Sequence, residues 1–300
     1  MPAEIRLARA EELGAAQQLV VASINQLTER HGFGAMASIR PPDFQSFSLR
    51  DDPEGLWVAE ADGDLIGFAF SWVCGDLWFL AELFVAPDQQ GGGVGRQLLS
   101  RTLEHASRAG ATTKALITFT FNVVSQGLYI RHGLFPRTPI YFFSLRREDF
   151  KPRPQEESLR FRPVSNSASD LTRLVGIDTN VLGVPRGKHH GYLLEDKSMQ
   201  GFFVERGGEC VGYAYISASG HVGPVALTRP DIISAAFTMA LSIAAGTGTS
   251  SISAFLPGCN EQALSAAAEH KMRITLPMLL VASREFGDWS RYLPRNPGFM

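Results

Sequence analysis

The sequence has no long apolar run. No stretch approaches the roughly 18 consecutive apolar residues of a membrane-spanning helix. The opening MPAEIRLARAEEL carries acids and arginines where a signal peptide has an apolar core. We therefore expect a cytoplasmic protein that has no membrane partner.

An excess of one charge sign is also missing. The chain has 28 Lys and Arg against 30 Asp and Glu, which gives a net charge of -2, and it has no run of five like charges. Proteins that bind nucleic acids depend on clustered basic residues, because contacts to phosphates dominate their affinity. The composition therefore predicts no nucleic-acid partner.

Cysteine is scarce and unpaired. The three cysteines, Cys74, Cys210 and Cys259, are far apart and form no CxxC pair. This spacing is evidence against a disulfide framework or a zinc site, and we expect no metal. The prediction is that all three are small, buried hydrophobic residues.

The length of 300 residues suggests two domains. The segment DFKPRPQEES, residues 149–158, has two prolines, three acids and no apolar period, and we interpret it as a linker. The predicted domains are residues 1–148 and 159–300, the latter including a C-terminal tail.

The same order of elements recurs in the two halves. The first half opens with the strand EIRLAR and a helix over 11–28, and the second with SLRFRP and a helix near 169–179. The hairpin pattern at 57–70, with an Asp62-Gly63 turn, returns 145 positions later at 202–215. The repeated order predicts an internal duplication of a mixed α/β unit.

The segment APDQQGGGVGRQLLS, residues 86–100, has four glycines in five positions between a strand (77–86) and an apolar-faced helix. Backbone N–H groups at a helix N-terminus are unpaired and attract anions, and glycines let an anion approach the main chain. Arg96 adds positive charge in the first helical turn. The segment therefore predicts an anion site, which the second half lacks because TRPDI stands in its place.

Two well-known phosphate loops do not fit this segment. A P-loop requires a lysine followed by Ser or Thr after its last glycine, and the dinucleotide fingerprint requires a third glycine where Leu98 stands.

The segment resembles the acetyl-CoA signature of the GNAT superfamily of N-acetyltransferases. The matching pattern is Gln90-x-x-Gly93-x-Gly95, preceded by LFV and followed by two leucines, and the hairpin VAEADGDLIGFA and the helix FNVVSQGLYIRHGL agree with it. The resemblance covers residues 1–147. It implies an α/β fold of two tandem GNAT-like domains, each with a mixed, mostly antiparallel sheet flanked by helices, in which the second domain is degenerate.

The resemblance implies acetyl-CoA as co-substrate, with its pyrophosphate on the N–H groups of residues 91–96. It also implies a bulge near Phe84–Val85 that parts two strands and leaves a gap for the pantetheine arm. The residues expected to bind acetyl-CoA are Phe84, Val85, Gln90, Gly91, Gly92, Gly93, Val94, Gly95, Arg96 and Asn122.

Two residues are candidates for catalysis. Tyr129 matches the general acid of the family by its position in SQGLYIRHG. Glu82 is a carboxyl group in an otherwise apolar strand, where its pKa should rise, and it is the candidate for the general base or for binding an ammonium group. Water remains an alternative base. For Asn122, capping of the following helix is an alternative to binding CoA.

The resemblance implies that the acceptor side comes from the loop after the first helix. Residues 31–47 carry Phe33, Phe44 and Phe47, which either form an apolar wall or hold the loop in place. Residues 183–194 are the equivalent loop of the second half and carry His189-His190, which we interpret as solvated; the alternative is that they reach the active cleft. The aromatic C-terminal tail, 286–300, is expected to dock across the two halves and to rigidify the cleft.

The sequence thus predicts an N-acetyltransferase that transfers acetyl from acetyl-CoA to a primary amine of a small molecule, by direct transfer in a ternary complex. A non-catalytic acyl-CoA sensor or interaction module is the alternative. Amino acid, polyamine, aminoglycoside and peptide N-terminus all remain possible acceptors, since a fold and a donor site do not fix the acceptor. The oligomeric state, monomer or homodimer, also remains open.

Overall fold

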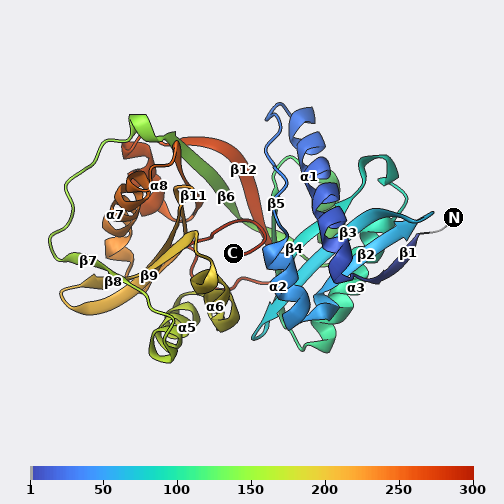
Figure 1. Cartoon of the computed structure of the whole chain (residues 1–300), viewed down its shortest axis with the longest axis horizontal. Helices are drawn as coiled ribbons and strands as arrows, with labels where there is room; N and C mark the ends of the chain where they lie inside the picture. Colours follow the sequence, from blue (N-terminus) through green and yellow to red (C-terminus); the bar gives the residue numbers. More distant parts are fainter. Residues whose placement is uncertain (1–2) are drawn as a thin grey trace. The chain divides into compact units, whose positions relative to one another are not determined.

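The computed structural model describes residues 3–300 and forms two compact units (Figure 1). The first unit comprises Met1–Phe135 and Val281–Arg284, and the second comprises Pro136–Leu280 and Glu285–Met300. The strand that follows residue 135 therefore packs within the second unit. The linker at 149–158 and the two functional domains remain predictions.

The first unit is built on a mixed sheet with the strand order β1-β2-β3-β4-β5, and the last two residues of β12 lie beside β5. The pairs are antiparallel except for β4 with β5, which are parallel. Its elements are β1 (Glu4–Leu7), α1 (Leu13–Arg30), α2 (Asp43–Asp51), β2 (Leu56–Ala61), β3 (Asp64–Cys74), β4 (Leu77–Val85), α3 (Val94–Arg108), β5 (Thr113–Phe119) and α4 (Val123–Arg131).

The second unit repeats this order and these directions in β7-β8-β9-β10-β11. Strand β6 pairs with β11, and the short β13 pairs with β10. Its elements are β6 (Phe135–Arg146), β7 (Leu159–Pro163), α5 (Ala168–Leu182), α6 (Gly187–Glu195), β8 (Met199–Arg206), β9 (Glu209–Ser217), β10 (His221–Leu227), α7 (Ile233–Gly246), β11 (Ser251–Pro257), α8 (Glu261–Glu269), β12 (Arg273–Ala282) and β13 (Tyr292–Leu293).

The helices of the first unit cover both faces of its sheet. On one face, Gly67 of β3 lies so close to α3 that an added Cβ would approach the Leu98 side chain to 2.9 Å. On the other face, Phe70 of β3 contacts Phe44 of α2, with ring centroids 5.3 Å apart. The alternation of side chains along β3 therefore directs α3 to one face and α2 to the other.

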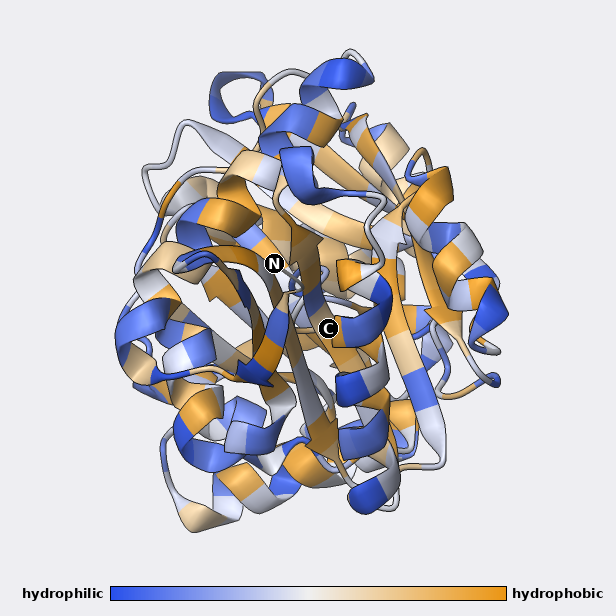
Figure 2. Ribbon diagram, turned by 90° about the vertical axis from the view of Figure 1, so that its right-hand side faces the viewer, coloured by the Kyte–Doolittle hydropathy of each residue, from blue (hydrophilic) through white to orange (hydrophobic). Residues whose placement is uncertain are grey.

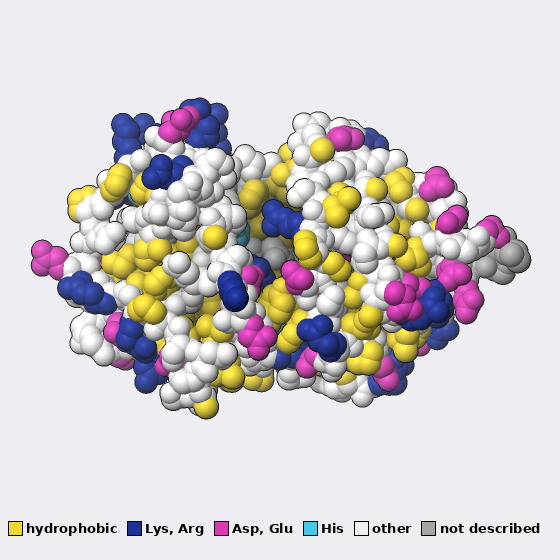
Figure 3. Space-filling model, viewed as in Figure 1, with side chains coloured by type: hydrophobic (Ala, Val, Ile, Leu, Met, Phe, Trp, Pro, Cys, Tyr) yellow, Lys and Arg dark blue, Asp and Glu magenta, His cyan; other side chains and the backbone are white. Residues whose placement is uncertain are grey.

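The helices are amphipathic, and the strands carry most of the apolar residues. Figure 2 shows helices striped in both colours beside largely apolar strands. In Figure 3, acidic and basic side chains are interspersed over much of the visible face. Among residues 3–300, no helix is both long and apolar enough to cross a membrane.

The two segments interpreted as loops are partly helical. Helix α2 begins inside residues 31–47, and α6 fills most of 183–194. The interpretation of His189 and His190 as solvated is wrong, because both side chains are buried. The apolar period of α6 is hidden in the sequence because histidines form much of its buried face.

The prediction of three buried cysteines is wrong in part. Cys74 is buried on β3, but Cys210 is only partly buried and Cys259 is exposed. Cys210 lies just after the turn at 207–208, and Cys259 lies within the turn at 258–259.

The packing of α3 on the sheet yields a stability prediction. Leu98 is fully buried between α3 and β3, whereas Gln97 beside it is exposed. We expect Leu98→Ala to lower the free energy of unfolding by about 2–5 kcal/mol, because it removes buried methyl groups and leaves a cavity. Urea unfolding followed by circular dichroism measures the loss. Gln97→Ala is the control, and equal effects of the two changes would contradict this packing.

Candidate active site

Strands β4 and β5 separate halfway along β4. Their parallel pairing runs from Leu77 to Leu80, while β4 continues to Val85. The register of β4 against β3 shifts between Leu80 and Glu82, which places the bulge at Ala81. The predicted bulge near Phe84–Val85 is therefore wrong in position, since those two residues pair regularly with β3.

The glycine loop, residues 90–96, connects β4 to α3. Gly91 and Gly93 have φ values of 89° and 83°, in the left-handed region that favours glycine. Gly93 is the N-cap residue, and α3 begins at Val94. The loop thus places the free N–H groups of the first turn of α3 next to the open end of β4.

A cleft of about 420 Å³ lies beside this loop, and we call it the glycine-loop cleft. Helices α1, α3 and α4, the loop and the end of β4 all contribute to its wall. Nine of the ten residues expected to bind acetyl-CoA line it; Gly92 is not among the lining residues. The lining residues are Ser23, Gln26, Leu27, Arg30, Leu83, Phe84, Val85, Gln89, Gln90, Gly91, Gly93, Val94, Gly95, Arg96, Asn122, Val124, Ser125, Leu128 and Arg131.

The charge of the glycine-loop cleft is positive. Arg30, Arg96 and Arg131 line it, and no Asp or Glu does. Within residues 3–300 none of these three arginines forms an ion pair, although most arginines of the chain do. Guanidinium groups and the free N–H groups of a helix N-terminus are donors that suit an anion, so the cleft has the chemistry that the predicted anion site requires.

Arg30 and Arg131 were not predicted as site residues from the sequence. Each is the last residue of a helix, and each is followed by His-Gly, so the tripeptide RHG occurs at both 30–32 and 131–133. In both copies the histidine ring nitrogen Nδ1 contacts a backbone carbonyl four residues earlier at 2.9 Å. The recurrence of RHG at two helix ends was the signal that could have found them.

Asn122 caps α4. Its side-chain oxygen accepts a hydrogen bond from the N–H of Ser125 at 3.2 Å, and the residue also lines the glycine-loop cleft. The predicted cap is therefore confirmed. A role in binding CoA remains a prediction.

Tyr129 does not itself line the cleft, but it contacts a residue that does. It is buried on α4 and is hydrogen-bonded to Ser125, which lines the cleft. Burial raises the pKa of the Tyr129 phenol well above its ordinary value, and the bond with Ser125 opposes this only in part. Tyr129 therefore keeps its proton throughout the neutral pH range.

Glu82 lies on β4 under α1 and α2. Its Oε1 accepts a hydrogen bond from Gln45 Nε2 at 3.0 Å, and the same nitrogen donates to Gln17 Oε1 at 3.2 Å. Its Oε2 is buried and has no hydrogen-bond partner among residues 3–300. Glu82 does not line the glycine-loop cleft, but Phe84, two residues further along the strand, does.

The environment of Glu82 changes its acidity. Burial raises the pKa of its carboxyl group to about 7, while the hydrogen bond from Gln45 opposes the rise. The predicted direction of this shift is confirmed. Gln45 and Gln17 were missed, because their role depends on contacts between α1, α2 and β4 that no local pattern in the sequence reveals.

The aromatic residues of segment 31–47 contact one another or nearby rings. Phe44 stacks on Phe47 with centroids 6.3 Å apart, and Phe33 stacks on Phe121 at 4.8 Å. These contacts agree with the interpretation that the aromatic side chains hold the segment in place.

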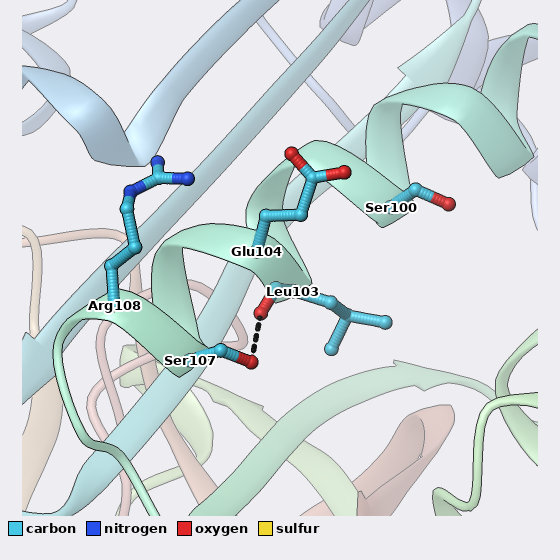
Figure 4. Close-up of a pocket in the computed structure, with 5 residues that line it drawn as sticks. All are labelled: Ser100, Leu103, Glu104, Ser107 and Arg108. Atoms are coloured by element: carbon cyan, nitrogen blue, oxygen red, sulfur yellow. Dashed lines mark hydrogen bonds between the residues drawn. The ribbon is translucent and has the colours of Figure 1, made fainter.

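The described residues also form two other hollows, in which many of the charged side chains are paired. Figure 4 shows the first, along the outer face of α3, where Ser107 donates to the carbonyl of Leu103. Glu104 and Arg108 are also paired there, with Arg101 and Glu54 respectively. The second hollow, about 720 Å³ in the second unit, mixes acids and bases, several of them paired.

Comparison with known sequences agrees with the geometry of the first unit. Residues 15–134 match the model of the acetyltransferase (GNAT) family. A mycothiol acetyltransferase of Streptomyces bingchenggensis is 33% identical over 112 residues, which cover 33% of this chain but only 36% of that relative. An uncharacterized N-acetyltransferase of Archaeoglobus fulgidus is 30% identical over 113 residues, which cover 34% of this chain and 73% of that relative.

Comparison with solved structures concerns the fold of the whole chain. A tandem GNAT protein from the clavulanic acid biosynthesis pathway superposes with a TM-score of 0.64 at 12% identity. The superposition covers 94% of this chain and 99% of that one. The predicted fold, two tandem units with mixed sheets flanked by helices, is therefore confirmed.

The surroundings of Glu82 yield a prediction that needs no substrate. NMR titration of its side-chain carboxyl carbon should give a midpoint near pH 7. Gln45→Leu should move the midpoint upward, because it removes the hydrogen bond that stabilises the charged form. Gln17→Leu is the control, since Gln17 contacts Gln45 but has no described contact with Glu82. A wild-type midpoint near the ordinary value of 4.5 would contradict the burial of this group.

Proposed function

Because the chain belongs to the GNAT acetyltransferase family, we propose that it is an N-acetyltransferase that uses acetyl-CoA to acetylate a primary amine of a small molecule. The observation that carries the proposal is the glycine-loop cleft, which has three unpaired arginines and no acid. A phosphate-rich, elongated ligand matches this cleft better than a neutral one.

The residues of the cleft fit coenzyme A. The N–H groups of the glycine loop, together with Arg96, would hold the pyrophosphate, and Arg30 and Arg131 would neutralise further phosphate charge. The backbone of Leu83–Val85, beyond the end of the pairing with β5, would form hydrogen bonds with the amides of the pantetheine arm. When bound, acetyl-CoA supplies the acetyl group as a thioester.

Direct transfer requires a neutral amine. A carboxyl group with a pKa of about 7 is half ionised near neutral pH and can accept a proton from an ammonium group. Glu82 is therefore the proposed general base. Because only its ionised form can act, activity should rise with pH through about 7. Gln45 would orient the carboxylate through its hydrogen bond to Oε1.

The thiolate that leaves requires a proton, and Tyr129 is its proposed source. The phenol is protonated at neutral pH because burial raises its pKa. Ser125 is hydrogen-bonded to Tyr129 and lines the cleft, so its hydroxyl is the proposed relay between the phenol and the leaving sulfur. Above about pH 7, Glu82 is mostly ionised while Tyr129 is still protonated, as an acid–base pair requires.

For the acceptor of this chain, we propose only a chemical class, a small-molecule amine. Most of the length of the mycothiol acetyltransferase lies outside the match, so its acceptor does not transfer with the similarity. A small-molecule amine is consistent with a balanced surface charge and with the absence of any large basic or acidic excess in the composition.

The hydroxyl of Tyr129 distinguishes an enzyme from an acyl-CoA sensor. We expect Tyr129→Phe to lower kcat by about 10²- to 10⁴-fold, because the general acid is lost, and to leave the Kd for acetyl-CoA within about twofold. Thiol release during turnover with a panel of amines, together with equilibrium binding, measures both quantities. Tyr141→Phe, which removes a hydroxyl from the second unit, is the control. A wild-type protein that binds acetyl-CoA but acetylates no amine would favour the sensor.

A further inference from the structure

The second unit contains a counterpart of the separated strands. Strand β10 pairs with β11 at His221 and Val222 only, and then continues to Leu227. Its register against β9 shifts between Val222 and Val225, as that of β4 against β3 does at Ala81. In both units, therefore, the equivalent pair of parallel strands, β4–β5 or β10–β11, separates at a bulge.

The sheet register makes the correspondence residue by residue. The hairpins of the two units are related by a shift of 145 positions, so Gly212 corresponds to Gly67. Leu227 lies opposite Gly212, just as Val85 lies opposite Gly67. By the same register, Val225 corresponds to Leu83, because their partners are Ala214 and Ala69. The edge of β10 at 225–227 is therefore the counterpart of the edge that lines the glycine-loop cleft.

The chain's own C-terminal segment occupies that edge. Strand β13 pairs with β10, with Leu293 opposite Val225 and Tyr292 opposite Ala226. The N–H of Leu227 donates to the carbonyl of Arg291 at 3.0 Å. We call residues 288–295 the tail segment and the edge 225–227 the second-unit slot.

Histidine and glycine hold the tail segment at the point where the strands part. His221 Nε2 lies 2.6 Å from the carbonyl oxygen of Arg295, and its Nδ1 lies 2.9 Å from the hydroxyl of Ser253. Gly223 has no side chain, and an added Cβ would approach the Pro294 carbonyl oxygen to 2.7 Å. The tail segment therefore contacts the backbone of β10 directly.

Side chains at the end of the chain are as buried as core residues. Tyr292 and Met300 are fully buried, and Phe299 is nearly so. The guanidinium carbon of Arg186 lies 5.1 Å from the centre of the Tyr292 ring, and Arg186 is in turn paired with the buried Asp178. The tail segment thus covers the buried ion pair of Arg186 and Asp178. Removal of the tail segment would leave these two charges only partly hydrated.

The second unit also lacks what the first offers to a phosphate-rich ligand. Pro224 directly precedes Val225, where the first unit has Glu82 before Leu83. The connection from β10 to α7 is TRPDI, residues 228–232, and contains no glycine. Neither the carboxylate nor the anion loop is present.

We propose that the tail segment is a built-in peptide ligand of the second unit, which occupies as a β-strand the slot that corresponds to the glycine-loop cleft. The second-unit slot is thereby closed to pantetheine-bearing ligands, and each chain takes up one molecule of acetyl-CoA. Only the identity of the excluded ligand rests on the proposed function; the occupancy of the slot does not.

The test cuts the tail segment free in the folded protein. A recognition sequence for a specific protease is inserted between Arg284 and Glu285, which are both exposed, and the full chain is cleaved after purification. We expect the released peptide to co-elute with the protein in gel filtration and the amide of Leu227 to stay protected from hydrogen exchange. Immediate loss of the peptide from the cut protein would overturn the proposal.

Two matched variants test, in the uncut chain, whether the tail segment closes the second-unit slot. His221→Phe preserves a ring between Phe142 and Phe255 but removes the contact with the Arg295 carbonyl. It should speed exchange of the Leu227 amide by about three- to tenfold, the effect of one hydrogen bond. His270→Phe is the control, because His270 is also buried and also stacks on a phenylalanine, Phe150. Equal exchange of the Leu227 amide in both variants would contradict a slot held closed by the tail segment.

Binding stoichiometry separates this proposal from the proposed function. Two equivalents of acetyl-CoA per intact chain would show an open second-unit slot and overturn the inference. No binding at all would contradict the proposed function, while retention of the cut peptide would still support the occupied slot.

Discussion

The separation of β4 from β5 after Leu80 is the constraint on which the first unit depends. If β4 and β5 paired to the end of β4, the backbone N–H and C=O groups of β4 would be hydrogen-bonded within the sheet. No strand edge would then be left for a ligand. The bulge at Ala81 parts the strands, and the glycine loop then places the start of α3 beside the exposed edge. One irregularity thus brings free backbone groups and three unpaired arginines to a single cleft.

The same irregularity has a different consequence in the second unit. There the backbone edge of β10 pairs with β13, and Pro224 stands where the first unit has its glutamine-bound glutamate. Buried backbone groups must be paired by some partner, because an unpaired group loses its hydration without compensation. In the second unit a strand of the same chain meets this requirement, and in the first unit the proposed ligand would meet it.

Local pattern predicted the elements that position the cleft, but not the contacts that complete it. The glycines after an apolar strand sufficed to predict the loop between β4 and α3, and the lone acid in β4 sufficed to predict that its pKa is raised. Helix α6 escaped prediction because histidines form part of its buried face, and one of them, His190, pairs with Asp178, twelve positions away. Arg30 and Arg131 lie a hundred residues apart in the sequence, and only the fold brings them to one cleft.

Calorimetric titration of the intact chain with acetyl-CoA tests the central claim, that the glycine-loop cleft is a donor site, most directly. The account predicts one equivalent per chain and an affinity that falls as salt is raised, because arginine–phosphate contacts are screened. Replacing both Arg96 and Arg131 with alanine should weaken binding by roughly 10- to 100-fold or more, since each charge-assisted contact is lost. Absence of binding, or an affinity unchanged in the double variant, would contradict the account.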